Sequence, residues 1–399
     1  MKEFVKKSGQ LLTPNYKRQP IMLVRGKGMK VWDSEGKEYL DFVAGIAAVN
    51  LGHSHPQVVK AVCGQLKKII HTSNIYYIKP QIELAELLIK NSVLDRAFFC
   101  NSGSEANEAA IKLARKFSRE KSNRGYKIIA AKNSFHGRTY GGLSATGQDK
   151  FKKGFAPMLP GFRFVPFGNA AELRKAIDRK TCAVMLEVVQ AEGGINIPPR
   201  GYFQAVREIC DRNHSLLILD EVQTGMGRLG KLFGYQWAGV RPDIITLAKA
   251  LGNGVPIGAM LARKEVAEVL VPGTHASTFG GNFLATTAAL ATIKVILEKK
   301  LYKRAEKIGR YFLARLLELK QKHPSIKAVR GVGLMLAAEL AIKSCERVVD
   351  QMRSAGFLIN LTQGNVLRFV PPLIVNQTEI DKLINSLDTA LIKFDPEIM

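Results

Sequence analysis

The sequence predicts an α/β protein, with a large central domain and a smaller α+β domain assembled from both ends of the chain. Between residues 56 and 298, short apolar runs alternate with segments of helical periodicity, which is typical of a sheet layered by helices. Residues 24–42 instead carry short strand-like pieces, and the segment after residue 300 alternates again. The chain has 399 residues and is 46% hydrophobic, enough for more than one domain.

The expected elements follow in chain order. The N-terminal strand-like pieces are broken at Gly26, Gly28 and residues 34–36. Central strands are expected at 97–100, 127–131, 183–189, 216–219, 244–248 and 257–262. Central helices are expected at 56–70, 80–91, 104–121, 169–178, 200–212 and 283–298. After them come helices near 301–321, 343–355 and 377–393, and strands near 333–340 and 366–370. We therefore expect a large domain at 56–300 and a small domain built from 1–55 and 301–399.

The formal net charge is +25, and residues 294–330 hold twelve lysines and arginines but only three acids. A nucleic-acid-binding surface is one interpretation of this excess. The same stretch has apolar residues at helical spacing: Leu301, Ile308, Phe312, Leu316 and Leu319. We interpret it as an amphipathic helix with a basic, solvated face, so small acidic metabolites are the favoured partners.

Cysteine and histidine usage favours a reduced, metal-free protein. The five cysteines, at positions 63, 100, 182, 210 and 345, have no paired spacing, and we expect them to be reduced thiols in the core. His53 and His55 lack the further ligands of a metal site, and His136 is expected to support the loop around it. The N-terminus lacks a signal-peptide pattern, and no apolar run reaches the roughly 18 residues of a membrane span. We expect a cytoplasmic protein.

Two apolar strands end in polar side chains. Lys249 follows the run at 243–248, and Asp220 follows the run at 215–219. A lysine in that place either lifts its ammonium into solvent or is desolvated, with a lowered pKa suited to Schiff-base chemistry. A carboxylate there caps a helix, joins an ion pair, binds Mg²⁺ or keeps a pyridinium nitrogen protonated. Each signal alone leaves these alternatives open.

A third signal is a strand that runs into a turn and a helix at residues 99–108. Ser102 and Glu105 have the spacing of a capping box, and Gly103 and Ser104 bring free N–H groups to the helix N-terminus, where an anion is stabilised. The loop matches neither a Walker A motif nor a dinucleotide fingerprint. An anion cradle, a carboxylate and a lysine 29 residues after it are the groups that a phosphorylated pyridine aldehyde requires.

Taken with these groups, the chain resembles the class III, ornithine-type aminotransferases that use pyridoxal 5′-phosphate, nearly from end to end. The resemblance rests on the joint order of eight stretches: 31–42, 52–56, 101–107, 135–139, 220–225, 247–258, 277–282 and 367–373. It implies a fold-type I transferase, whose large domain has a mainly parallel seven-stranded sheet. It also implies a homodimer with a shared active site.

The resemblance assigns a cofactor site. Lys249 is expected to hold pyridoxal phosphate as a Schiff base and to shuttle a proton, while Asp220 faces the ring nitrogen. Gln223 is expected at the 3-oxygen of the ring and Phe135 on its face. The remaining cofactor contacts are expected from Ser102, Gly103, Ser104, Val222 and, from the partner subunit and on the phosphate, Thr278.

Substrate residues follow from the same resemblance. Arg138 is expected to bind the α-carboxylate, since its planar guanidinium suits bidentate contact, and Arg368 is expected to bind 2-oxoglutarate or glutamate. Glu192 is expected to mask Arg368 while the amine donor is bound and to swing away for the dicarboxylate. Ser277 is expected from the partner subunit. The family usually has glycine in place of Ala191, and alanine would strain the loop if that position required a positive φ.

The implied reaction transfers an ω-amino group. The expected donor is N2-acetylornithine and the acceptor 2-oxoglutarate, giving N-acetylglutamate 5-semialdehyde and glutamate, a step of arginine biosynthesis. Ornithine, succinylornithine and 4-aminobutyrate are alternative donors. A non-catalytic protein that binds nucleic acid is the alternative outside enzymes, and the intact Lys249, Asp220 and Arg138 argue against it.

Overall fold

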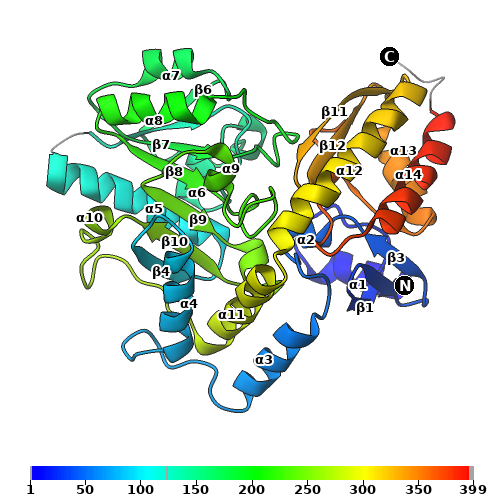
Figure 1. Cartoon of the computed structure of the whole chain (residues 1–399), viewed down its shortest axis with the longest axis horizontal. Helices are drawn as coiled ribbons and strands as arrows, with labels where there is room; N and C mark the ends of the chain where they lie inside the picture. Colours follow the sequence, from blue (N-terminus) through cyan, green and yellow to red (C-terminus); the bar gives the residue numbers. More distant parts are fainter. Residues whose placement is uncertain (1, 123–124, 395–399) are drawn as a thin grey trace.

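The computed structural model describes residues 2–122 and 125–394, and Figure 1 shows them arranged in two lobes. The larger lobe contains a seven-stranded sheet in the order β4-β10-β9-β8-β7-β5-β6. Among the described strands of this sheet, β10 runs antiparallel to both neighbours and the other pairs are parallel. The strands are β4 (Arg96–Cys100), β5 (Lys127–Ala131), β6 (Phe162–Val165), β7 (Thr181–Glu187), β8 (Leu216–Asp220), β9 (Ile244–Leu247) and β10 (Gly258–Ala262). The predicted mainly parallel seven-stranded sheet is confirmed.

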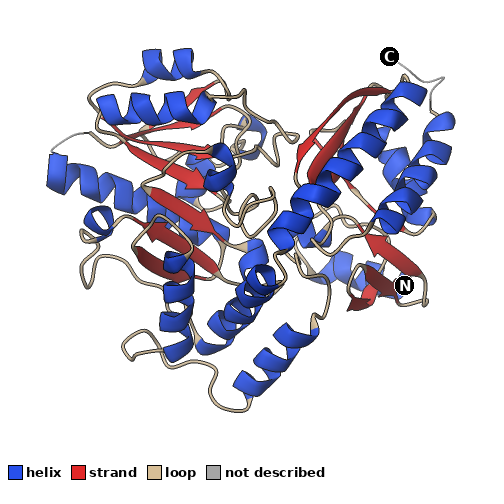
Figure 2. Ribbon diagram, viewed as in Figure 1, coloured by secondary structure: helices blue, strands red, loops and turns tan. Residues whose placement is uncertain are grey.

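Helices cover this sheet, as Figure 2 shows. They are α3 (Pro56–Leu66), α4 (Lys79–Lys90), α5 (Gly103–Phe117), α6 (Tyr140–Ala145), α7 (Ala170–Ala176), α8 (Tyr202–Arg212), α9 (Gly234–Ala238), α10 (Lys264–Ala267) and α11 (Phe283–Glu298). Shorter helical turns are η1 (Ser118–Ser122), η2 (Asp149–Phe151) and η3 (Lys249–Leu251). Every residue of β7, β8 and β9 is buried, which explains why these strands read as continuous apolar runs rather than as alternating patterns.

The smaller lobe joins the two ends of the chain, blue and red in Figure 1. It has two four-stranded sheets, β1-β2-β3-β13 and β11-β12-β15-β14, and β13 pairs with β3 in parallel. Its strands are β1 (Leu23–Lys27), β2 (Lys30–Asp33), β3 (Glu38–Asp41), β11 (Ile326–Val332), β12 (Met335–Leu340), β13 (Phe357–Leu358), β14 (Asn360–Thr362) and β15 (Val366–Phe369). The remaining helices are α1 (Lys2–Leu11), α2 (Ala44–Ala47), α12 (Leu301–Lys322), α13 (Cys345–Ser354) and α14 (Gln377–Ile392). We propose that the lobes are domains with the expected boundaries near residues 55 and 300.

The basic segment after residue 300 forms α12, the amphipathic helix that its pattern predicts. All five of its regularly spaced apolar residues are buried: Leu301, Ile308, Phe312, Leu316 and Leu319. Lys303, Lys307 and Arg310 are exposed on the other side of the helix. The charge of this segment therefore lies on a solvated face, while its apolar stripe packs into the core of the smaller lobe.

Two sequence expectations need correction. The chain does not break at Gly26, because β1 continues through it and Gly26 pairs with Val31. A side chain there would meet His53, since an added Cβ would lie 2.7 Å from the Cβ of His53. Cys63 is exposed, whereas the other four cysteines are buried, and all five are free thiols.

A buried arginine connects the lobes. Arg228 follows β8 in the larger lobe and is fully buried, and burial lowers the pKa of its guanidinium to about 9. Its Nη1 donates to the carbonyl oxygens of Leu334 at 2.8 Å and Pro371 at 2.5 Å, both in the smaller lobe. Its Nη2 donates to the side-chain oxygen of Asn50. Since buried carbonyl groups need donors, these bonds hold the two lobes in one relative position.

Within the described residues, no helix combines the length and the apolar character needed to cross a bilayer.

Candidate active site

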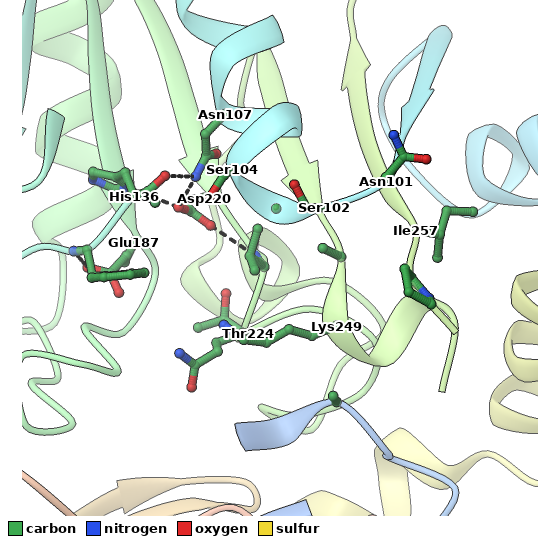
Figure 3. Close-up of a pocket in the computed structure, with 18 of the residues that line it drawn as sticks. Asn101, Ser102, Ser104, Asn107, His136, Glu187, Asp220, Thr224, Lys249 and Ile257 are labelled. Carbon is green, nitrogen blue, oxygen red and sulfur yellow. Dashed lines mark hydrogen bonds and ion pairs between the residues drawn. The ribbon is translucent and has the colours of Figure 1, made fainter. Parts of the chain in front are cut away.

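A cavity lies at the carboxyl ends of β8 and β9, the edge of a parallel sheet where ligands usually bind (Figure 3). Its polar lining includes five residues that the sequence singles out, Ser102, Ser104, Asp220, Gln223 and Lys249, and two to which it assigns no role, Asn107 and Glu187. Strand register explains the meeting of the acids, because Glu187 of β7 pairs with Asp220 of β8. Phe135, Gly103 and Val222 also line the cavity.

Asp220 is buried and is held by three groups. Its Oδ2 lies 2.8 Å from His136 Nδ1 and accepts from Asn107 Nδ2 at 2.8 Å, while its Oδ1 accepts from the N–H of Val222 at 3.0 Å. Burial raises the pKa of this carboxyl, but the hydrogen bond and charge of His136, with the bonds of Val222 and Asn107, outweigh it and the pKa is lowered. Asp220 therefore presents a negative charge inside the cavity.

Lys249 lies beside this charge, directly after β9. Its backbone has φ 45°, the left-handed region that residues other than glycine rarely adopt and that recurs at functional sites. Burial lowers the pKa of its ammonium, and Arg368 lowers it further, while Glu192, Asp220 and Glu187 offset part of the shift. A neutral amine in this place is a nucleophile toward a carbonyl carbon.

The N-terminus of α5 forms the anion cradle. Ser102 Oγ accepts from the N–H of Glu105 at 3.2 Å, as the capping pattern predicts, but the Glu105 carboxylate accepts from the N–H of Asn101 instead of that of Ser102. The cradle has no room for larger residues. A Cβ on Gly103 would lie 2.8 Å from Val222, and one on Gly137, which has φ 131°, would lie 2.6 Å from Ser104 Oγ.

Gln223 connects the cavity to Glu192. Its Nε2 donates to Glu192 Oε1 at 3.0 Å, whereas its Oε1 is buried and has no hydrogen-bond partner among the described residues. A buried carbonyl oxygen without a donor is costly, so this atom suits a ligand that brings an O–H or N–H group. Together with the cradle, Asp220 and Lys249, it fits a phosphorylated pyridine aldehyde that carries a ring hydroxyl.

Glu192 pairs with Arg368 across the two lobes. Arg368 Nη1 lies 2.5 Å from Glu192 Oε1, and its Nε donates to Asn360 Oδ1 at 3.2 Å. The Arg368 side chain is 1% exposed and that of Glu192 26% exposed. Burial raises the pKa of Glu192, but the charge and hydrogen bond of Arg368, with Lys249 and Gln223, outweigh it and the pKa is lowered. The carboxylate is therefore charged, and it covers a guanidinium that has no other acid in contact within the described chain.

Arg138 is exposed and follows Phe135, His136 and Gly137 of the cavity lining without lining the cavity itself. Its guanidinium carbon lies 4.1 Å from the ring centre of Phe151 and 5.5 Å from that of Phe135. The two rings meet edge to face, with centroids 5.8 Å apart. Its backbone N–H donates to Ser104 Oγ at 3.3 Å. These aromatic contacts hold the planar guanidinium of Arg138 without using its N–H groups, so the N–H groups are free to bind a carboxylate.

Ser277 and Thr278 do not line the cavity within one chain. Ser277 Oγ accepts from Asn101 Nδ2 at 3.2 Å and from the N–H of Gly280 at 3.0 Å, while Thr278 is exposed. Asn74 Nδ2 donates to the Gly280 carbonyl oxygen at 2.8 Å and so holds the same loop. The loop thus presents Thr278 outward, next to the rim residue Asn101.

Sequence reasoning missed three residues of the site. Asn107 bridges Asp220 and the His136 carbonyl oxygen, and Thr246 in turn donates to Asn107 Oδ1 at 2.7 Å. The spacing of Gly103 and Asn107, one helical turn apart, is a signal that could have placed Asn107. His136 contacts Asp220, beyond its expected role in its own loop.

Glu187 is the third missed residue, although it ends a strand just as Asp220 does. Its oxygens accept from the N–H groups of Phe135 at 3.0 Å and Ala191 at 3.3 Å. Burial and the nearby Asp220 raise its pKa well above the usual value, although the two N–H groups oppose the shift. Ala191 itself does not have a positive φ, so the expected strain is absent there; Gly194 and Ile195 adopt φ 105° and 57° instead.

The two histidines near residue 54 lie apart from the cavity lining. His53 Nε2 lies 2.8 Å from Asp41 Oδ2, and no group of three or more potential metal ligands occurs in residues 2–122 and 125–394.

Comparisons with known proteins agree with this chemistry. A family model described as "Aminotransferase class-III" matches residues 12–391. The chain is 52% identical to the acetylornithine aminotransferase of Caldanaerobacter subterraneus subsp. tengcongensis, covering 95% of this chain and 97% of that protein. It is 53% identical to the acetylornithine aminotransferase of Methanocaldococcus jannaschii, covering 94% of each.

Among solved structures, the ornithine aminotransferase of Toxoplasma gondii superimposes with a TM-score of 0.94 at 35% identity, covering 98% of this chain and 95% of that one. The match extends over both lobes, so the whole architecture is shared and not the sheet alone.

The lowered pKa of Lys249 makes a chemical prediction. A lower pKa leaves more of the amine neutral at a given pH, so at about pH 8 Lys249 in cofactor-free protein should react with pyridoxal phosphate faster than ordinary lysines. Borohydride reduction followed by peptide mapping should find the main label on Lys249, and Lys249→Arg should lose it. Labelling spread evenly over the exposed lysines would contradict the prediction.

Proposed function

Because this chain belongs to the class III aminotransferases, which use pyridoxal phosphate, we propose that it transfers the δ-amino group of N2-acetylornithine to 2-oxoglutarate. The products are N-acetylglutamate 5-semialdehyde and glutamate, and the reaction is a step of arginine biosynthesis. The observation that carries the proposal is the buried Arg368 covered by Glu192 beside the cavity. The choice of donor is supported by the relatives named above, since those at 52% and 53% identity are acetylornithine aminotransferases.

Pyridoxal phosphate, when bound, supplies an aldehyde that takes up the amino group and a ring that withdraws the electrons released beside it. Lys249 is proposed as its attachment point and then as the base and acid that moves the proton, for which a lowered pKa is suited. Asp220 is proposed to keep the ring nitrogen protonated, with His136 and Asn107 holding its carboxylate. The α5 N-terminus with Ser102, Gly103 and Ser104 is proposed to bind the phosphate, and Phe135 and Val222 are proposed to contact the ring.

The two arginines are proposed to bind carboxylates. Arg138, whose guanidinium has no acid partner among the described residues, is proposed to bind the α-carboxylate of N2-acetylornithine and the distal carboxylate of 2-oxoglutarate. Arg368 is proposed to bind the carboxylate next to the keto group of 2-oxoglutarate, a group that N2-acetylornithine lacks at its reacting end. Glu192 neutralises Arg368 while the donor is bound, and it must leave when the dicarboxylate enters, since the two anions compete for one guanidinium.

A homodimer with shared active sites is proposed as the working form. Support comes from large apolar side chains left exposed around the 277–282 loop, among them Ile75 at 79%, Tyr77 at 96% and Phe279 at 59%. Such a patch on a single chain is typical of an interface. Ser277 and Thr278 are proposed to reach the partner's site from this loop.

The proposed location of the enzyme is the cytoplasm, and its five free cysteines support this proposal.

The proposed donor is tested by comparing rates. Steady-state kcat/KM measured with N2-acetylornithine, ornithine, succinylornithine and 4-aminobutyrate, each with 2-oxoglutarate, should be highest for N2-acetylornithine. Its acetyl group removes the positive charge of the α-amine, so no acid is needed to bind that end. A kcat/KM for N2-acetylornithine among the lowest of the four would overturn the substrate assignment and leave the aminotransferase activity in place.

The roles of the arginines make a second prediction. Arg368→Ala should slow the 2-oxoglutarate half-reaction by roughly tenfold to several hundredfold, because a substrate carboxylate loses a charge-assisted partner in a closed site. The donor half-reaction should slow much less, whereas Arg138→Ala should slow both. Single-turnover absorbance changes of the cofactor measure each half-reaction separately. Equal losses in both half-reactions for Arg368→Ala would rule out the proposed division of roles.

The shared site makes a third prediction. Sedimentation at micromolar concentration should detect the dimer without a measurable monomer, and Thr278→Ala should weaken cofactor binding while leaving the sedimentation coefficient unchanged. A fully active monomer would contradict the shared site.

A further inference from the structure

The loop that carries Glu192 leaves the larger lobe and is held by side chains of the smaller one. Thr362 Oγ1 donates to the carbonyl oxygen of Glu192 at 2.9 Å, and Gln363 Nε2 donates to the same oxygen at 2.6 Å. Both residues lie at the turn between β14 and β15, and β15 also carries Arg368. One hairpin therefore binds the backbone and the carboxylate of Glu192 at the same time.

A second attachment follows two residues later in the loop. Arg330 of β11 donates from Nε to the carbonyl oxygens of Gly194 at 2.9 Å and Ile195 at 3.1 Å, and its Nη1 pairs with Glu339 at 2.7 Å. Ile195 has φ 57°, which is strained for a β-branched residue. Strained backbone persists only where its surroundings over-determine it, and these bonds supply that constraint.

The base of the loop is closed within the larger lobe. Gln190 and Asn196 exchange two backbone hydrogen bonds of 3.1 Å, and Asn196 Nδ2 donates to Gln190 Oε1 at 3.0 Å. With its base closed and its carbonyl groups bound, the backbone around Glu192 has little freedom. The mobile part that remains is the Glu192 side chain, whose carboxylate must exchange between covering and releasing Arg368.

Gln363 also contacts the segment next to Arg138. Its Nε2 donates to Gln148 Oε1 at 3.0 Å, and its Oε1 accepts from Lys150 Nζ at 3.2 Å. Phe151, the next residue, is the ring over which the Arg138 guanidinium lies. Gln363 thus contacts both the backbone of Glu192 and the segment that carries the Phe151 ring.

We propose that Thr362 and Gln363 are specificity-determining positioning residues, which act through Glu192 by fixing the backbone from which its carboxylate swings on and off Arg368. The inference rests on the proposed function, since it concerns how the same site discriminates between an uncharged donor end and a carboxylate. With the carbonyl held, the extended side chain reaches Arg368 in one arrangement. With the carbonyl released, the carboxylate covers Arg368 for a smaller fraction of the time, and dicarboxylates compete for it more easily.

The test is the preference between two amine donors. The double variant Thr362→Val with Gln363→Ala removes both donors to the Glu192 carbonyl oxygen and keeps the carboxylate. In single-turnover reactions of the holoenzyme, the ratio of second-order rate constants for N2-acetylornithine over glutamate should fall by about threefold to thirtyfold, the scale of one or two neutral hydrogen bonds. Thr362→Ser, which keeps a hydroxyl, should retain most of the wild-type ratio.

Repeating the double substitution in a Glu192→Ala variant separates an effect through the Glu192 carboxylate from a general loss of stability. In that background the double variant should leave the ratio unchanged within about twofold, because no carboxylate remains to be positioned. A matched control is Gln204→Ala, since the exposed Gln204 also donates Nε2 to backbone carbonyl oxygens, at 2.9 Å and 3.0 Å, but does so far from the cavity. It should leave the ratio unchanged.

The outcomes are distinguishable. Equal loss of rate for both donors, or the same change of ratio in the Glu192→Ala background, would overturn the positioning role and assign these side chains to stability alone. Should the double variant fold poorly, Gln363→Ala alone replaces a single exposed side chain and must lower the ratio in the same direction. A wild-type holoenzyme that does not react with N2-acetylornithine would instead defeat the proposed function itself.

Discussion

The ion pair between Arg368 and Glu192 is the interaction on which the arrangement of the site depends. The guanidinium is 1% exposed, and its acid partner comes from the other lobe. Removing one member of such a buried pair commonly costs about 3–5 kcal/mol, because the remaining charge stays buried and unpaired. The pair joins the two lobes, and the fully buried Arg228 adds bonds to carbonyl groups of the smaller lobe. The same pair blocks a carboxylate position and is available for exchange with a substrate anion.

The second constraint is the parallel sheet. Because β7, β8 and β9 run in the same direction, their carboxyl ends bring Glu187, Asp220 and Lys249 to one edge. Burial at that edge favours the neutral form of all three groups, and the hydrogen-bond and charge partners of each group decide how far its pKa shifts. Hydrogen bonds keep Asp220 charged, whereas Glu187 beside it has a raised pKa, and Lys249 has a lowered one. Opposite pKa shifts of groups that share one site are typical of a site built for proton transfer.

Much of the fold and of the cavity lining could be predicted from the sequence, because the ends of strands and the N-termini of helices are marked by residues close together in the chain. The strands leading to Asp220 and Lys249 and the cap at Ser102 needed no knowledge of distant contacts. The edge strand β6 was missed because it is short and interrupted by Arg163. His136 and Asn107 were misjudged because their partner, Asp220, is distant in the chain. The bonds of Thr362 and Gln363 to Glu192 depend on how two lobes meet, which no local pattern encodes.

The central claim is that Glu192 exchanges between covering Arg368 and yielding it to a substrate carboxylate while its backbone stays in place. A crystal structure of the holoenzyme with 2-oxoglutarate bound tests this most directly. We expect a 2-oxoglutarate carboxylate on Arg368, the Glu192 carboxylate turned away, and its carbonyl oxygen still within hydrogen-bond distance of Thr362 and Gln363. A structure in which Glu192 remains on Arg368 while 2-oxoglutarate binds elsewhere in the cavity would contradict the account.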